Sequence, residues 1–305
     1  MGTPSEFTYP KYLRAKRTVD EHALNHRVWT RFVQSLIHRG PSVRLVEVGA
    51  GVGTTAIRTL EALGDSSIEQ ISYTLVDINP DNLEAARSRL RNWFREQDAQ
   101  LKEDNAFRYA DLEVSLRFVQ ADLFDFAALE SEAGYDTVIA QALLDLLPVA
   151  RALEALRPLL QKGGVWYLPI HFDGVTAFEP VLDAELDAKI TRLYHESMTE
   201  NIDEEGGGDG AHTGRRLLPR LRDAGASLVE AGSSDWVVFA RNDGYREREA
   251  YFLHHILHFI EQELSDHPDL DADTFAGWVQ QRRRQIEAHE LVYVAHQLDV
   301  LAVQG

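Results

Sequence analysis

Residues 46–55 read Val-Glu-Val-Gly-Ala-Gly-Val-Gly-Thr-Thr, and they carry more information about the fold than any other segment. The apolar run Val43–Val48 predicts a strand, and the segment Thr54–Ala62 predicts a helix. Glycines at alternate positions allow a sharp turn and a close approach to a ligand, because no Cβ stands in the way. The helix that follows presents unpaired backbone N–H groups toward the same place. The stretch therefore predicts a strand, a ligand-binding turn and a helix.

Short apolar runs and helical patterns go on alternating along the chain. The further predicted strands are Ile71–Val76, Phe118–Val119, Thr137–Ala140 and Val165–Ile170, and the helices include Asp81–Phe94 and Val149–Leu160. Strands that alternate with helices imply right-handed crossovers and a parallel sheet covered on both faces. Two later runs, Ser227–Glu230 and Trp236–Ala240, have hairpin-like spacing, so we expect an antiparallel strand to close the sheet.

Three segments outside this alternation predict helices. Residues 1–40 carry apolar side chains at a helical period, and residues 174–214 combine a helical stripe with the glycine-rich run 204–210, which predicts an inserted lid with a loop. Residues after Asp243 predict two more helices, the second over Thr274–Leu301. The expected organisation is a helical cap (1–40), a core (41–241) and a C-terminal helical extension (242–305).

The composition limits the class of protein and its partners. The 305 residues are 44% hydrophobic and 26% charged, which rules out wholesale disorder, and no cysteine is present to form a disulfide or a thiolate metal site. No apolar run approaches the ~18–20 residues of a membrane-spanning helix, and the first residues lack a secretory signal. We therefore expect a cytoplasmic protein with no membrane partner. The formal net charge of −18 would repel a polyphosphate, so we do not expect this acidic protein to bind nucleic acid.

The glycine spacing indicates what the turn binds. Dinucleotide-binding proteins use Gly-x-Gly-x-x-Gly to receive a pyrophosphate, whereas here the third glycine, Gly53, comes one residue early. Glu47 stands two residues before the first glycine, where its charge would disfavour a pyrophosphate. The Gly-x-x-x-x-Gly-Lys-Ser/Thr pattern of phosphate-binding loops is absent from the sequence. A ligand with an amino group and a ribose, but without phosphates, fits better.

Polar residues at the ends of the other predicted strands agree with such a ligand. Ligands of open parallel sheets lie beyond the carboxyl ends of the strands. There, Asp77 is placed to accept hydrogen bonds from two ribose hydroxyls, and Ile78 to pack on a purine. Asp122 stands where an exocyclic amine could donate, and residues 139–145, which include Gln141, line the place of the ligand's reactive end.

The ordered set of motifs resembles the class I S-adenosylmethionine-dependent methyltransferases, over roughly residues 41–241. The expected fold class is α/β. It consists of a Rossmann-like, mostly parallel seven-stranded sheet with an antiparallel last strand, plus N-terminal and C-terminal helical additions. The resemblance implies S-adenosyl-L-methionine as the cofactor. The residues that it implies for binding are Glu47, Gly49, Ala50, Gly51 and Gly53 at the methionine portion, Asp77 at the ribose, and Ile78, Asp122 and Leu123 around the adenine.

Simpler interpretations of these residues stay open. The glycine turn would then be only a tight connection, and Asp77 would cap the helix that opens at Asn79-Pro80. Asp122 would cap the next helical turn, and Gln141 and Asp145 would be ordinary surface polar groups.

Methyl transfer needs an aligned nucleophile and, for some acceptors, a base. His171 follows the predicted strand Val165–Ile170 on the ligand side, and imidazole titrates near neutral pH, so His171 is the first catalytic candidate. The alternative is a histidine that only bonds local backbone. Asp145 and His195 are the further candidates.

Two segments carry candidates for binding outside the predicted core. An aromatic and basic cluster within residues 9–17 can fold over the cofactor, with Arg17 pairing its carboxylate, or can be an exposed helix face. Phe178, Tyr194 and Met198 are either walls of an acceptor pocket or plain core. Histidine pairs such as His22 and His26 have helical zinc-ligand spacing, but no third ligand is visible, and we expect no metal.

The sequence thus predicts an S-adenosylmethionine-dependent methyltransferase that acts on a small-molecule acceptor by in-line displacement. The alternatives are a non-methylating enzyme or regulator on the same scaffold, and methylation of a protein or RNA. A nucleotide-linked redox enzyme is disfavoured by the glycine spacing. Spare apolar stripes on the C-terminal helices also lead us to expect a homodimer.

Overall fold

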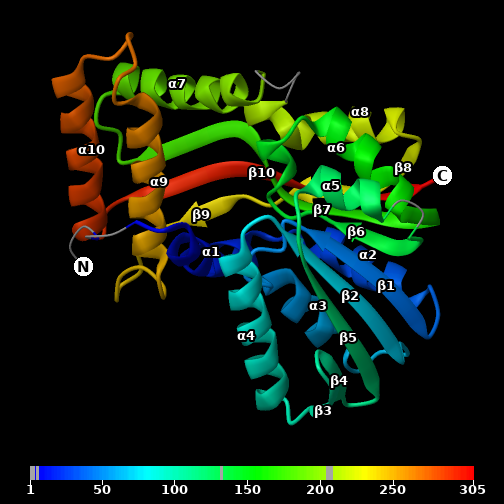
Figure 1. The fold of residues 1–305 in the computed structure, drawn as a ribbon. Coiled ribbons are helices and arrows are strands. Elements are labelled where there is room, and N and C mark those ends of the chain that lie inside the picture. The colour runs from blue at the N-terminus through cyan, green and yellow to red at the C-terminus, as the bar shows by residue number, and fades with distance from the viewer. Residues whose placement is uncertain (1–3, 5–6, 131–132, 204–208) are drawn as a thin grey trace.

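A mixed sheet runs through the computed structural model, which describes residues 4, 7–130, 133–203 and 209–305. Within them the sheet has ten strands in the order β3-β4-β5-β2-β1-β6-β7-β10-β8, and β9 pairs with β10 (Figure 1). The strands are β1 (Ser42–Val48), β2 (Gln70–Asp77), β3 (Gln100–Glu103), β4 (Ala106–Tyr109), β5 (Leu112–Gln120), β6 (Tyr135–Ile139), β7 (Leu160–Glu179), β8 (Ala226–Ser233), β9 (Trp236–Val238) and β10 (Val292–Gln304).

Helices and short 3-10 turns connect the strands. The helices are α1 (Tyr9–Ala23), α2 (His26–Ile37), α3 (Thr54–Leu63), α4 (Pro80–Glu96), α5 (Leu123–Leu129), α6 (Val149–Leu156), α7 (Ala184–Asp203), α8 (Thr213–Asp223), α9 (Glu249–Leu264) and α10 (Ala272–Glu287). The 3-10 turns are η1 (Leu144–Leu146), η2 (Arg157–Leu159) and η3 (Gly210–His212). No helix among the described residues combines the length and the apolar character that crossing a membrane requires.

The predicted sheet type is confirmed. Strands β5, β2, β1, β6 and β7 pair in parallel, and β10, the last strand of the chain, is antiparallel to both β7 and β8. The seven predicted strands correspond to β1, β2, β5, β6, β7, β8 and β9. The edge pair β3–β4 and the central strand β10, which were not predicted, bring the described sheet to ten.

Alternating side chains of each central strand enter two separate cores. In β1, Leu45 joins a cluster with α2, α3 and α4, whereas its neighbour Val46 joins a cluster with α5, α6 and α8. Both residues are fully buried. A parallel sheet with helices on both faces buries its strands from both sides, which explains the near-continuous apolar runs of the sequence.

Two predictions for the end of the chain are wrong. The second C-terminal helix, α10, stops at Glu287, and residues Val292–Gln304 form β10 in the middle of the sheet instead of a helix up to Leu301. Strands β8 and β9 form no hairpin with each other, because each pairs with β10. Burial alternates from residue to residue along most of β10, which is the period of two expected of a strand. The sequence analysis assigned a helical period to the same residues. The extension 242–305 is therefore not wholly helical.

Strand β7 is much longer than predicted. It runs to Glu179 and not to Ile170, because β10 pairs with it from Val303–Val165 to Val292–Glu179. Figure 1 shows both strands extending beyond the parallel sheet toward α9 and α10. There, a third core joins α1, α7, α9 and α10 to the far ends of β7 and β10. The predicted lid helix is α7, and residues 204–208 of the glycine-rich run lie outside the described residues.

The expected N-terminal cap divides into two parts. Helix α1 packs in the third core with α9, while α2 packs on the sheet beside α3. Only α1 therefore lies where it can contribute to a site between the third core and the sheet.

Candidate functional site

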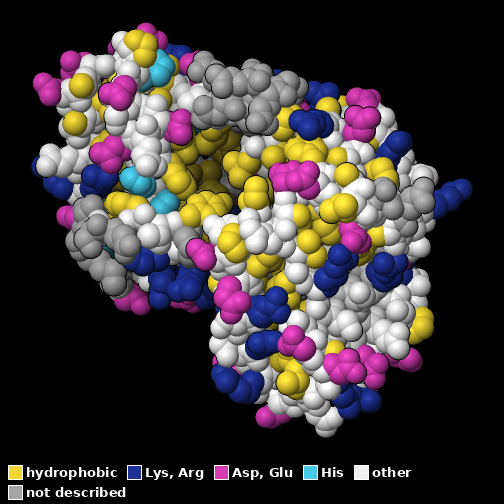
Figure 2. Space-filling view, in the orientation of Figure 1, with side chains coloured by type: hydrophobic (Ala, Val, Ile, Leu, Met, Phe, Trp, Pro, Cys, Tyr) yellow, Lys and Arg dark blue, Asp and Glu magenta, His cyan; other side chains and the backbone are white. Residues whose placement is uncertain are grey.

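One cavity of about 820 Å³ lies between the carboxyl ends of the parallel strands and the third core. One side is formed by the loops after β1, β2, β5 and β6, and the other by α1, α7, α9 and β9. Figure 2 shows a hollow with mainly hydrophobic walls on this face of the molecule. The volume is in the range of ligand and cofactor sites.

The glycine turn forms the floor of this cavity, and its glycines have different reasons to be glycine. All three have positive φ, +66° at Gly49, +52° at Gly51 and +73° at Gly53. A Cβ on Gly49 would come within 2.9 Å of Leu143, and one on Gly53 within 3.2 Å of the Ala86 Cβ. A Cβ on Gly51 would meet only Leu13, at 3.6 Å. Gly51 thus faces open cavity, while Gly53 lies beneath it as the N-cap of α3 and does not line the cavity.

Asp77 holds this turn in place. Its Oδ2 accepts a hydrogen bond from the Gly51 N–H (2.8 Å), and its Oδ1 accepts from the Asn79 N–H (2.9 Å) and from the Asn82 Nδ2 (3.2 Å). A carboxylate has about four acceptor positions, so one position remains on Oδ2. Asp77 therefore keeps one open acceptor position for a ribose hydroxyl, one fewer than the sequence analysis assumed.

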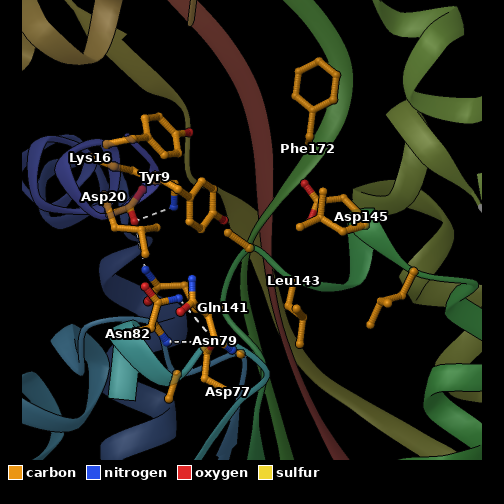
Figure 3. Close-up of a pocket in the computed structure, with 18 of the residues that line it drawn as sticks. Tyr9, Lys16, Asp20, Asp77, Asn79, Asn82, Gln141, Leu143, Asp145 and Phe172 are labelled. Carbon is orange, nitrogen blue, oxygen red and sulfur yellow. Dashed lines mark hydrogen bonds and ion pairs between the residues drawn. The ribbon is translucent and has the colours of Figure 1, made fainter. Parts of the chain in front are cut away.

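Asn82 supplies a second acceptor beside Asp77 and was missed by the sequence analysis. The side chain is 3% exposed and lines the cavity, and its Oδ1 has no hydrogen-bond partner. A buried amide oxygen without a partner is costly unless a ligand satisfies it. The available signal was its position in the first turn of α4, three residues after the cap Asn79 (Figure 3).

The residues expected around a purine also line the cavity. Ile78 is 67% exposed there, and Leu123 is buried beside it. Asp122 is the N-cap of α5, and its Oδ1 accepts from the Phe124 N–H (2.7 Å). The capping interpretation of Asp122 is therefore correct, and its second oxygen is left for a ligand.

A buried chain of hydrogen bonds ties α1 to the sheet. Gln141 Oε1 accepts from the Thr55 Oγ1 (2.8 Å), and its Nε2 donates to the Asp20 Oδ2 (3.0 Å). Asp20 also accepts from the Trp236 Nε1 (3.0 Å) and pairs with the Lys16 Nζ (2.7 Å). Figure 3 shows Lys16 and Asp20 on α1 facing Gln141. Asp20 thus joins α1, β9 and the end of β6 in one place.

The basic residue predicted for a cofactor carboxylate is engaged elsewhere. Arg17 lines the cavity, but its guanidinium donates to Glu21 (2.9 and 3.0 Å) and to Glu247 (2.8 Å). Lys16, in contrast, is 7% exposed and lies in the cavity wall. The i,i+4 spacing of Lys16 and Asp20 was visible in the sequence, but not that this pair faces inward.

Glu47 lies at the base of the cavity. It is 2% exposed, and its Oε2 accepts from the Tyr73 hydroxyl (2.8 Å). Burial raises the pKa of Glu47 to about 7, although the Tyr73 hydrogen bond opposes this shift. The carboxyl group is therefore ready to accept or donate a proton close to neutral pH.

His171 is not brought to the cavity. It is fully buried inside the long strand β7, not at its end, and does not line the cavity. Its Nε2 accepts from the Leu144 N–H (3.3 Å), and its Nδ1 lies 3.3 Å from the Leu168 carbonyl oxygen. Burial lowers its pKa to about 3. His171 therefore supports η1, and the structure does not place this first catalytic candidate in the cavity.

The two other catalytic candidates, His195 and Asp145, differ in whether they line the cavity. His195 is on α7 with its Nε2 3.0 Å from the Thr176 Oγ1, and it does not line the cavity. Burial lowers the pKa of His195 to about 4. Asp145, on η1, does line the cavity, and burial raises its pKa to about 6. Of the three candidates, the structure brings only Asp145 to the cavity.

The remaining wall is aromatic. Phe172 and Tyr194 line it, and so do Tyr9 and Tyr12 of the aromatic and basic cluster at residues 9–17. The sequence analysis did not place three further lining side chains there: Trp236, Phe259 and Tyr293. Met198 lines the wall as predicted, whereas Phe178 packs against Trp278 and Tyr293 instead. No cluster of metal-binding side chains occurs in the described part of the chain.

Comparisons with known proteins agree with this geometry. A family model described as "Methyltransferase domain" matches residues 46–166. The chain is 31% identical over 134 residues to a highly reducing polyketide synthase of Purpureocillium lilacinum, which is 43% of this chain and 5% of the synthase. It is 32% identical over 127 residues to the methyltransferase calH of Penicillium decumbens, which is 40% of this chain and 30% of that protein. The chain thus spans only a small part of the polyketide synthases that it matches.

A solved structure of similar fold is a SAM-dependent methyltransferase from Thiobacillus denitrificans in complex with S-adenosyl-L-homocysteine. It has a TM-score of 0.48 and 13% sequence identity, with 100% of each chain covered. The family match contains the glycine turn, Asp77, Asp122 and Gln141, and so agrees with the methyltransferase family predicted from the sequence. Residues 46–166 are therefore similar to a methyltransferase domain.

Proposed function

We propose that this chain transfers a methyl group from S-adenosyl-L-methionine to a small-molecule acceptor. The observation that carries the proposal is that one cavity contains both the glycine turn and an aromatic wall. A nucleoside bound at the glycine turn and an acceptor bound against the aromatic wall can therefore meet without solvent between them.

Residues at and around the glycine turn fit the cofactor. The cavity side of Gly51 offers room for the methionine portion, and the open acceptor position of Asp77 and the unpartnered Asn82 Oδ1 would hold the two ribose hydroxyls. Ile78 and Leu123 would flank the adenine, with Asp122 near its amino group. Lys16 is better placed than Arg17 to receive the carboxylate, because it lies deeper in the wall.

The bound cofactor supplies an electrophilic methyl group on a sulfonium, so the protein has mainly to align the acceptor and to exclude water. Helix α1, fixed by Asp20, would form one side of the enclosure, and α7 and α9 would form the other. Of the three catalytic candidates from the sequence, Asp145 is the one that can take a proton from the acceptor, because it alone lines the cavity. Transfer within a small enclosure is what supports a small acceptor over a protein or RNA.

A second candidate is methylation of an activated carbon. The names of several relatives, the polyketide synthases, favour it. Their matches cover less than half of this chain, however. Much of the aromatic wall comes from α1, α7, α9, β9 and β10, outside the family match at residues 46–166. The relatives therefore support the methyl donor more strongly than the acceptor.

The experiment is methyl transfer from radiolabelled S-adenosylmethionine to a panel of small acceptors, with detection of S-adenosylhomocysteine. Asp77→Asn is the matched variant, and we expect it to bind the cofactor more weakly. Cofactor binding without transfer to any acceptor would favour a non-methylating protein on this scaffold. No cofactor binding would refute the proposal. Dimerisation and a cytoplasmic location stay predictions, and size-exclusion chromatography with light scattering tests the first.

A further inference from the structure

One oxygen of the Asp145 carboxylate is unpaired in the wall of the cavity. The Asp145 Oδ1 has no solvent exposure and no hydrogen-bond partner. The side chain reaches the cavity from η1, opposite α1, as Figure 3 shows. Burial raises the pKa values of Tyr9 on α1 and Tyr194 on α7, and the charge of Asp145 adds to both shifts. A buried charge of this kind is costly to the folded protein unless a ligand pairs with it.

Aromatic rings line the same cavity as this carboxylate. The main ones are Tyr12, Phe172, Tyr194, Trp236, Phe259 and Tyr293. Aromatic faces carry partial negative charge and attract cations, most strongly where water is excluded. Rings beside a carboxylate form a combination that recognises an ammonium group.

The charges of the wall point in the same direction. Asp20 and Asp145 contribute two carboxylates to this part of the cavity. Among the described lining residues, the basic ones are Lys16, which pairs with Asp20 at 2.7 Å, and Arg17, which is held by Glu21 and Glu247. The surplus is therefore negative. An acceptor that brings a positive charge is stabilised here, and one that develops an enolate or phenolate is not.

We propose that the acceptor is an amine with an apolar or aromatic body, and that Asp145 binds its ammonium group. The inference rests on the proposed function and names the class of its substrate. In the reaction, the ammonium gives one proton to the Asp145 carboxylate, and the freed nitrogen lone pair forms the new C–N bond. The C–S bond breaks with its electron pair remaining on sulfur, which leaves S-adenosylhomocysteine and an N-methylated ammonium. Asp145 returns its proton to solvent when the products leave.

The test compares amines with alcohols of the same shape. Binding of phenethylamine and tryptamine, and of phenethyl alcohol and tryptophol, is measured by calorimetry on the protein saturated with S-adenosylhomocysteine. We expect each amine to bind at least about 10-fold more tightly than its alcohol, as a charge-assisted hydrogen bond predicts. In Asp145→Asn, which keeps the shape of the side chain, this preference should disappear.

The matched control is Asp111→Asn, because the Asp111 side chain is fully exposed and far from the cavity lining. It should keep the preference of the wild type. Unchanged affinity for S-adenosylhomocysteine in Asp145→Asn would show that this variant is folded. If Asp145→Asn does not fold, the amine and alcohol affinities of the wild type still test whether the cavity prefers an amine.

Three results would overturn the inference: equal binding of amine and alcohol, no binding of either amine, or a preference that survives in Asp145→Asn. Methylation of an acetoacetyl thioester without any amine binding would refute the amine acceptor and leave the proposed function intact. Failure to bind S-adenosylhomocysteine would refute the proposed function instead. Amine binding to the unloaded protein would then still be measurable.

Discussion

The two walls of the cavity are built in different ways. The cofactor wall consists of strand ends and the backbone of one glycine turn, together with short polar side chains such as Asp77 and Asn82. The aromatic wall consists of long side chains from α1, α7, α9, β9 and β10. Each loop of the cofactor wall is one short segment of the sequence. The aromatic wall, in contrast, brings Tyr12 and Tyr293 into one cavity from opposite ends of the chain.

This difference separates the two tasks of the site. A parallel sheet places its strand ends at one edge, so short motifs are enough to form the cofactor wall. The aromatic wall depends on packing in the third core, where α1 and α9 meet. Variants of the first wall should therefore change cofactor binding alone, and variants of the second wall acceptor binding alone. The following predictions test this separation.

Gly51→Val should have the largest effect. Its φ of +52° is strained for valine, and the new side chain would occupy the cavity where the cofactor lies. We expect the affinity for S-adenosylhomocysteine to fall by more than about 1000-fold, or about 4 kcal/mol. Calorimetry measures this loss. Gly277→Ala is the control, because Gly277 has open space around it and lies within helix α10. This variant should bind S-adenosylhomocysteine with unchanged affinity. Near-normal binding by Gly51→Val would show that the turn is only a connection.

Glu47→Gln should change how stability depends on pH. The folded pKa of Glu47 is raised to about 7 from 4.5, so between these values the folded state holds a proton that the unfolded state releases. The contribution of Glu47 is present below pH 4.5 and is lost as the pH rises through 7. The wild type should therefore lose about 3 kcal/mol relative to Glu47→Gln across this window. Urea unfolding at several pH values measures the difference, and parallel curves for the two proteins would contradict the prediction.

His171→Ala should act on stability more than on chemistry. It removes a buried ring and leaves the Leu144 N–H without its acceptor, at a cost of about 2 kcal/mol. Thermal unfolding measures this loss. The affinity for S-adenosylhomocysteine should stay close to that of the wild type, because His171 is absent from the cavity wall. If His171 were the base, turnover would fall by about 100-fold or more at conditions where the variant is fully folded.

Asn82→Ala should have the smallest effect. It removes the unpartnered Oδ1 and one hydrogen bond to Asp77, while the bonds from Gly51 and Asn79 remain. We expect the affinity for S-adenosylhomocysteine to fall by about 1 kcal/mol, close to five-fold. The matched measurement uses adenine, which lacks the ribose. Equal losses for adenine and for the nucleoside would show that Asn82 does not contact the ribose.

The sequence by itself determined the parallel sheet, the glycine turn and the strand-end carboxylates Asp77 and Asp122. These features follow from local patterns, because period, glycine spacing and strand ends are readable along the chain. The long β7 and the central strand β10 were not readable, since their pairing joins residues far apart in sequence. That error also placed His171 at a strand end, where its side chain would have faced the ligand.

Only the tertiary structure decided which polar groups face the cavity and which are used for support. Arg17 and Lys16 are adjacent in sequence, yet α1 packs so that Lys16 is buried beside Asp20, while Arg17 is drawn to Glu247 on a distant segment. His171 was the first catalytic candidate and Asp145 a weaker one, but packing leaves the Asp145 Oδ1 unpaired and gives both His171 nitrogens backbone partners. Side-chain partners of this kind depend on contacts between remote elements, which no local pattern specifies.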